Sequence, residues 1–222
     1  MKLVSVDVAR TTWLFPLTEL NPRGLSFTKA FLGLAERYDF KKFPRHTGDF
    51  DPEAKGLIFN EGTFKSRDGR DIVVKLTIFT DGILADSWSS TSDSEDFLKD
   101  GMQWLKTEHG FSIPADRKVK TLYLSQLTVT TDKKIASLNP KLQAFADSIA
   151  SKLEDRWEDN TGFSVSGISF GPNDPTTPSA PANFRFEVKA GTATAEKRYF
   201  AFAPVPTDVH LQLLEKLESL FG

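Results

Sequence analysis

The order of predicted elements in the first half of this 222-residue chain returns in its second half. Nearly the same tetrapeptide precedes the first predicted helix of each half: Leu20-Asn21-Pro22-Arg23 in one and Leu138-Asn139-Pro140-Lys141 in the other. An Asn at this place caps a helix, and a Pro fits the first turn, where no backbone N–H is required. This repeated start and the shared order of six elements predict an internal duplication.

Each half is predicted to be one β-α-β-β-β-α unit, because period-two alternation indicates strands and helical spacing of apolar residues indicates helices. Asp68-Gly69 and Asp81-Gly82 predict tight turns between strands. Ser92 and Glu95 fit a capping box at the start of a helix. The predicted strands cover residues 3–8, 57–64, 72–80, 83–88, 122–130, 163–170, 184–188 and 198–202, and the predicted helices cover residues 25–38, 93–109, 140–157 and 207–221.

These elements predict an α+β fold of two tandem copies, with antiparallel meander sheets covered by helices on one face. The repeats are expected at residues 1–115 and 116–222, either as two domains or as one fused domain. The duplicated order resembles the repeat of the TATA-box-binding fold and of other folds that place helices on a curved sheet. The resemblance implies a fold and no function, because element order alone carries it.

Charge and composition exclude several classes of function. The net charge of −2 disfavours nucleic-acid binding, which needs a basic surface. The absence of cysteine excludes disulfides, thiolate catalysis and cysteine-based zinc sites. No apolar run approaches the roughly 18 residues of a membrane helix, and the N-terminus lacks the apolar region of a signal peptide. We therefore expect a cytoplasmic protein that makes no membrane contact.

The search for catalytic chemistry predicts no catalytic residue, metal or cofactor. The three histidines are scattered, and none lies at metal-ligand spacing from another. Gly167-Ile168-Ser169-Phe170-Gly171 fits a nucleophile motif, but Pro172 and Pro175 follow it where a helix would be required. Asp49, Asp51 and Glu53 alternate in the manner of oxygen ligands for Ca²⁺ or Mg²⁺, although a solvated loop explains them as well.

Two segments are candidates for contact with a partner. Residues 171–181 form a proline-rich loop where the first half has a tight turn, and Pro172, Asp174, Pro175 and Pro178 are its candidate contact residues. The segment at residues 12–17 carries bulky side chains without a clear period, so Trp13 and Phe15 lie either in the core or at an interface. Residues 9–22 are expected to be irregular, since two prolines interrupt them.

Two arginines beside the Asp68-Gly69 turn, Arg67 and Arg70, are candidate anion-binding residues. Together these observations favour a non-enzymatic protein-binding or assembly module, with a protein partner or self-association. A first alternative is a carrier of an apolar small molecule, because some of the 19 phenylalanines could line a cavity. A second alternative is a metal-dependent enzyme that uses the loop carboxylates Asp49 and Asp51.

Overall fold

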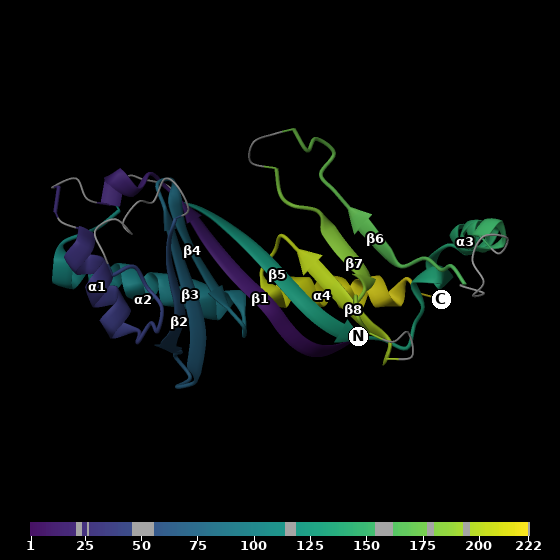
Figure 1. Cartoon of the computed structure of the whole chain (residues 1–222), viewed down its shortest axis with the longest axis horizontal. Helices are drawn as coiled ribbons and strands as arrows, with labels where there is room; N and C mark the ends of the chain where they lie inside the picture. The colour runs from purple at the N-terminus through teal and green to yellow at the C-terminus, as the bar shows by residue number, and fades with distance from the viewer. Residues whose placement is uncertain are drawn as a thin grey trace. The chain divides into compact units, whose positions relative to one another are not determined.

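A computed structural model describes residues 1–20, 24–25, 27–45, 56–113, 119–153, 162–176, 180–192 and 196–221. Its strands form one eight-stranded sheet in the order β2-β3-β4-β1-β5-β8-β7-β6, and the neighbours whose register is described are antiparallel (Figure 1). The elements are β1 (Lys2–Leu14), η1 (Leu17–Leu20), α1 (Phe27–Arg37), β2 (Leu57–Lys65), β3 (Asp71–Phe79), β4 (Gly82–Ser87), α2 (Thr91–His109), β5 (Lys120–Thr130), η3 (Ile135–Leu138), α3 (Pro140–Leu153), β6 (Gly167–Phe170), β7 (Phe184–Val188), β8 (Arg198–Ala203) and α4 (Thr207–Ser219).

The chain forms two compact units, each of which draws on both halves of the sequence. The N-terminal unit comprises residues 6–125 and 205–207, and the C-terminal unit comprises residues 1–5, 126–204 and 208–222. Strands β1 and β5 therefore contribute residues to both units. The boundary predicted between residues 115 and 116 falls outside the described residues.

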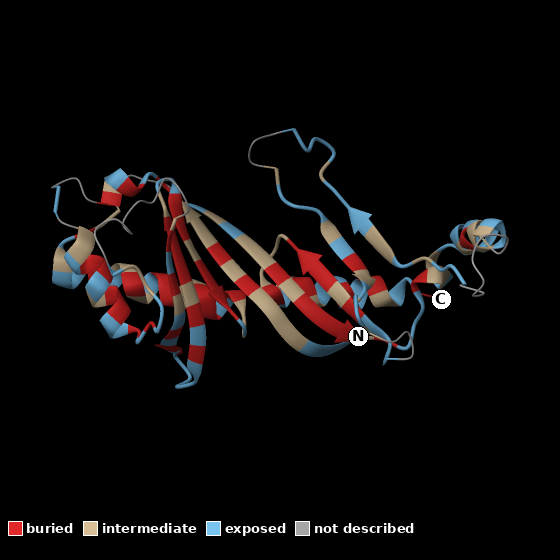
Figure 2. Ribbon diagram, viewed as in Figure 1, coloured by how far each residue is buried: buried red, intermediate tan, exposed pale blue. Residues whose placement is uncertain are grey.

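One face of the sheet in the N-terminal unit is buried beneath α1 and α2 (Figure 2). Strand β2 buries Leu57 and Phe59, and a register shift between Phe59 and Gly62 lets Phe64 face the same side. A Cβ atom at Gly62 would come within 2.4 Å of the Phe40 ring, so this close approach requires glycine. Alternate residues of β3 complete the buried face.

The core of the C-terminal unit lies between its strands and α4. The Phe186 ring of β7 is fully buried and stacks on Tyr199 of β8, with ring centroids 4.8 Å apart. Leu214 and Phe221, from α4 and the residues after it, are 1% and 3% exposed. Leu214, Leu217 and Phe221 therefore lie on the buried side that the period of the sequence predicts. Leu213, which the same period places inward, is exposed.

The structure corrects three of the predicted boundaries. Strand β1 continues through the stretch expected to be irregular and ends at Leu14, because Thr11 and Trp13 pair with Ala85 and Ile83 of β4. Strand β6 begins only at Gly167. Helix α2 begins at Thr91, two residues before the predicted start.

The capping residue of α2 is Ser90, and the predicted capping box of Ser92 and Glu95 is wrong. Both pairs, Ser90 with Asp93 and Ser92 with Glu95, fit the same sequence pattern. The structure uses the earlier pair, since the Glu95 side chain instead accepts a hydrogen bond from Tyr123 and pairs with Lys99. Among the described residues, no helix is long and apolar enough to cross a membrane.

Candidate functional site

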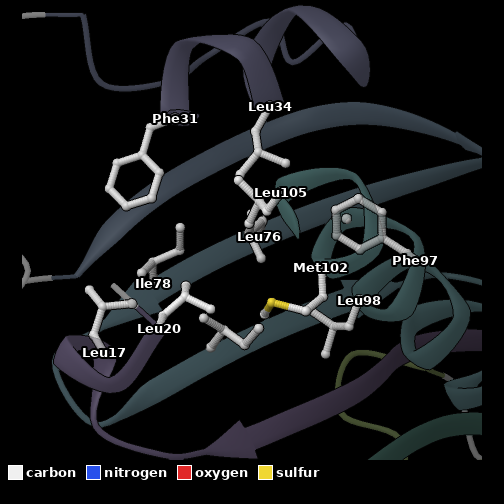
Figure 3. A pocket seen from close by; sticks show the side chains of 12 residues that line it. Leu17, Leu20, Phe31, Leu34, Leu76, Ile78, Phe97, Leu98, Met102 and Leu105 are labelled. Atoms are coloured by element: carbon white, nitrogen blue, oxygen red, sulfur yellow. The ribbon is translucent and has the colours of Figure 1, made fainter. Parts of the chain in front are cut away.

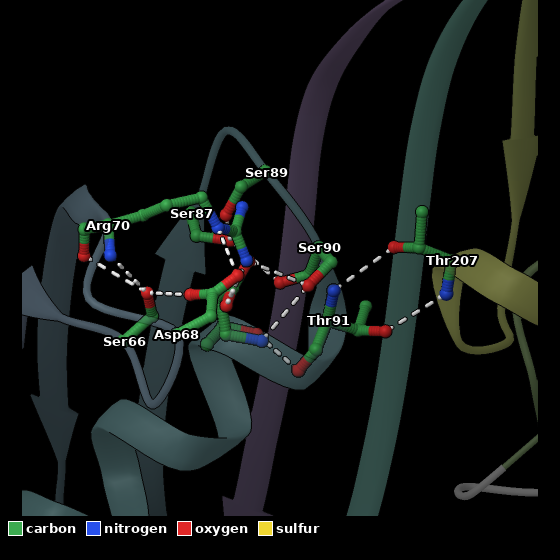
Figure 4. Close-up of polar contacts among 10 residues, drawn as sticks. Ser66, Asp68, Arg70, Ser87, Ser89, Ser90, Thr91 and Thr207 are labelled. Atoms are coloured by element: carbon green, nitrogen blue, oxygen red, sulfur yellow. Dashed lines mark hydrogen bonds and ion pairs between the residues drawn. The ribbon is translucent and has the colours of Figure 1, made fainter.

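A polar cluster joins the β2–β3 turn to the beginning of α2 (Figure 4). The Asp93 backbone N–H donates to Ser90 Oγ at 3.0 Å, and Ser90 Oγ donates to Asp93 Oδ2 at 2.8 Å. This reciprocal cap satisfies a backbone N–H of the first turn. The Asp93 carboxylate also lies at the positive end of the helix dipole, which stabilises its charge.

The two candidate anion-binding arginines both lie in this region, and each already contacts a carboxylate. Arg70 Nε donates to Asp68 Oδ2 at 2.6 Å, and its terminal nitrogen lies 3.5 Å from Asp93 Oδ1. Arg67 donates to Asp96 Oδ1 at 2.8 Å. An incoming anion would therefore compete with carboxylates of the same chain.

Hydrogen bonds from the Ser66 hydroxyl and from Arg70 lower the pKa of Asp68 to about 2. The carboxylate is therefore ionised over the whole neutral range. The Ser66 hydroxyl also accepts from the Arg70 backbone N–H at 3.0 Å, which closes the turn. These contacts hold the β2–β3 turn in place beside the beginning of α2. They do not form a catalytic acid–base pair.

The residues that could carry catalysis do not converge. Ser169 lies on β6 and donates to the Phe184 carbonyl at 3.3 Å, with no helix described directly after it. No group of three or more His, Asp or Glu side chains that could hold a metal occurs among the described residues. Asp49, Asp51 and Glu53 lie outside the described residues.

His210 of α4 is fully buried, and in the described structure neither of its ring nitrogens has a hydrogen-bond partner. Burial lowers its pKa to about 4, because the charged form would lose its hydration. Its ring meets Phe184 edge-on, with centroids 6.0 Å apart. The side chain is thus neutral at pH 7 and acts as part of the apolar core.

An apolar cavity of about 30 Å³ lies inside the N-terminal unit, where side chains from η1, α1, α2 and the sheet point toward one another (Figure 3). Leu17 and Phe31 lie on one side of it, and Phe97 and Met102 lie on another. An engineered apolar cavity of about 150 Å³ binds benzene, so this space would have to expand to hold an organic ligand.

The candidate contact residues Trp13 and Phe15 belong to the N-terminal unit. Phe15 is 5% exposed and forms part of its core, and Trp13 packs partly against that core. Of the two interpretations left open by the sequence, burial favours the core for this pair. In the proline-rich loop, Asp174 and Pro175 are exposed and Pro172 is half-buried, whereas Pro178 lies outside the described residues.

Helix α3 exposes the apolar stripe that its sequence pattern predicts to face the core. Phe145 is 66% exposed and Leu142 is 49% exposed, and Ala146 is the one residue of α3 that is buried. The matching helix of the first half, α1, buries Ala30, Phe31, Leu34 and Ala35. Figure 2 shows this difference along the two helices.

The C-terminal unit exposes a second set of apolar side chains on β6, on α4 and in the turn after α4. Phe170 is 61% exposed, Leu220 is 62% exposed and Leu213 is 40% exposed. The Phe184 ring lies 6.0 Å from the rings of both Phe170 and His210, so it links the end of β6 to α4. We call Ile168, Phe170, Leu213 and Leu220 the α4–β6 surface.

Sequence reasoning missed this surface, because periodicity shows that a stripe is apolar and does not show whether anything covers it. The comparisons with known proteins provide no further guide: no protein-family model matches the chain, and no curated protein is similar to it.

Proposed function

We propose that this chain is a non-enzymatic protein-binding or assembly module built on a duplicated α+β scaffold. The observation that carries the proposal is the apolar side chains exposed on α3 and on the α4–β6 surface. Large contiguous apolar patches on the surface of a monomeric protein are typical of interaction sites. Of the exposed loop residues, Asp174 would supply a polar contact to such a partner and Pro175 an apolar one.

The arrangement of elements supports the duplication. In each half a strand is followed by a short 3-10 helix, and these two helices, η1 and η3, end at Leu20 and Leu138, the first residues of the repeated tetrapeptide. Three strands and two α-helices then follow in the same order in both halves. Copies of one unit would produce this order. The absence of cysteine supports a cytoplasmic location as part of the same proposal.

Native mass spectrometry of the full chain, purified gently from its own cells, tests the proposed function. We expect a discrete complex heavier than the 24.8 kDa chain. A chain that stays at 24.8 kDa under all conditions, without a bound protein, would contradict it.

A carrier of an apolar small molecule is the second candidate, and the apolar cavity beneath α1 and α2 favours it. The same spectrum distinguishes the two functions, since a carrier would show the chain mass with a small adduct. Substituting Met102 by Trp would fill the cavity from α2 and should abolish the adduct. The carboxylate-based enzyme has no support from the described residues.

A further inference from the structure

In the N-terminal unit, α1 packs against one flank of α2, the helix that holds the same place in the element order as α4. On α2, Trp104 lies against Gly33 of α1, where an added Cβ would come within 2.6 Å of the indole. Phe97 meets the edge of Tyr38 at a centroid distance of 4.8 Å, and the Tyr38 hydroxyl donates to Asp100. Helix α1 therefore packs on the flank of α2 that carries Phe97, Asp100 and Trp104.

Helix α4 and the turn residue after it carry apolar side chains at the same places, and there they are exposed. Counted from the first residue of each helix, Thr91 in α2 and Thr207 in α4, Leu213 takes the place of Phe97 and Leu220 takes the place of Trp104. Leu213 is 40% exposed and Leu220 is 62% exposed. The flank that α1 covers in one unit is thus open in the other.

The neighbouring strand completes this open surface. In the register of β6 with β7, Ile168 lies opposite Phe186 and Phe170 lies opposite Phe184. Because side chains directly opposite in a sheet share a face, Ile168 and Phe170 lie on the face of the buried Phe186. The α4–β6 surface therefore has the composition and position of a site for an amphipathic helix.

Helix α3 of the same chain has an exposed apolar stripe that could pack on such a surface. Leu142, Phe145 and Ile149 lie on one side of α3, and the first two are largely exposed. This stripe has the spacing by which α1 packs in the N-terminal unit. One chain thus carries both an uncovered helix and an uncovered surface for a helix.

We propose that two copies of this chain associate reciprocally, with α3 of each copy packed on the α4–β6 surface of the other. This inference rests on the proposed assembly function and names the partner as a second copy. Such a contact is isologous and closes after two chains, as most homodimers do.

The contacts of α3 favour a second copy over the same chain. Gln143 Nε2 donates to the Phe163 carbonyl at 3.1 Å, and Asn139 Oδ1 accepts from the Lys141 backbone N–H at the start of the helix. Packing α3 on its own α4–β6 surface would require the helix to move. A second copy can dock as a rigid body while these contacts persist, which is the usual behaviour of pre-organised interfaces.

The area available is sufficient for a specific contact. The five most exposed side chains involved are between 40% and 66% exposed. Since an aromatic side chain buries about 150–250 Å² and a leucine somewhat less, they offer on the order of 500 Å² per chain. Burial on both copies gives roughly 1,000 Å², about the minimum for a biological interface.

Cysteine cross-linking tests this proposal directly, because the natural chain has no cysteine. One full-length chain carries Phe145→Cys, a second carries Phe170→Cys, and the two are mixed and treated with a short bis-maleimide. We expect a covalent dimer in the mixture and little or none with either variant alone. The control pairs Leu32→Cys, at an exposed site on α1, with Phe170→Cys, and should give no covalent dimer.

A chain carrying both Phe145→Cys and Phe170→Cys distinguishes the alternatives. Cross-linking only within this double variant, with none in the mixture, would show that α3 closes on its own chain and would overturn the proposal. Absence of both cross-links, with the circular dichroism of the natural chain retained, would also overturn it. A complex with a different protein in the native mass spectrum, without these cross-links, would leave the assembly function standing and this inference refuted.

Discussion

Thr91 and Thr207, the first residues of α2 and α4, hydrogen-bond each other twice. The Thr91 backbone N–H donates to Thr207 Oγ1 at 3.1 Å, and the Thr207 backbone N–H donates to Thr91 Oγ1 at 2.9 Å (Figure 4). The two residues are 1% and 5% exposed. Each side chain therefore caps the other helix and satisfies an N–H that would otherwise be buried without a partner.

Replacing either threonine by valine should destabilise the chain by about 1–2 kcal/mol, because one buried N–H loses its acceptor. The double variant T91V/T207V should cost about the sum of the two single variants, since each substitution removes a different hydrogen bond. Urea unfolding of the four proteins measures these costs. Thr107→Val, at an exposed position on α2, is the matched control and should change little. Single variants that are as stable as the natural chain would contradict the reciprocal cap.

The Asp68 carboxylate should contribute to stability at neutral pH and lose that contribution in acid. Its pKa is lowered to about 2 in the folded chain by Ser66 and Arg70, against an ordinary value of 3.8. The contribution is therefore complete above pH 4 and disappears as the pH falls toward 2. We expect Asp68→Asn to be less stable than the natural chain at pH 7 and equally stable near pH 2. Asp71→Asn, at an exposed position on β3, serves as the control. A difference that persists unchanged at pH 2 would refute the assignment.

His210 should make the chain less stable as the pH falls from 7 to 4. Its pKa is lowered from 6.5 to about 4, so the unfolded chain takes up the proton first and stability rises with pH across this window. The effect should reach at most about 3 kcal/mol, from 1.36 kcal/mol per pKa unit. Stability measured against pH should be flatter in His210→Leu than in the natural chain. Parallel curves for His210→Leu and the natural chain would contradict this role.

Much of the fold could be predicted from the sequence because local patterns determine it. Strand β7 occupies the predicted residues 184–188, since alternation and the proline-rich loop before it mark both of its ends. The Asp-Gly pairs mark the turns before β3 and β4, and Gly69 has the positive φ of 83° that such a turn uses. The end of β1 could not be predicted, because its pairing with β4 continues as far as Leu14.

The candidate site was less predictable, because it depends on tertiary contacts between elements that are distant in the sequence. The sequence places Arg67 and Arg70 beside a turn, but only the structure shows that Asp96, Asp68 and Asp93 contact them. The α3 stripe has the spacing of a core helix, as α1 has, and yet Phe145 is exposed. Spacing alone cannot separate a helix that covers its own sheet from one whose stripe is left open to a partner.

The most direct test of the central claim is the solution mass of the purified full chain, measured by light scattering over a range of concentrations. The natural chain should show a mass above 24.8 kDa that rises with concentration. Phe145→Asp, which places a charge on the open α3 stripe, should return it to 24.8 kDa, and Leu32→Asp should behave as the natural chain does. If the natural chain and Phe145→Asp both remain at 24.8 kDa at every concentration, the apolar surface of the C-terminal unit does not drive self-assembly.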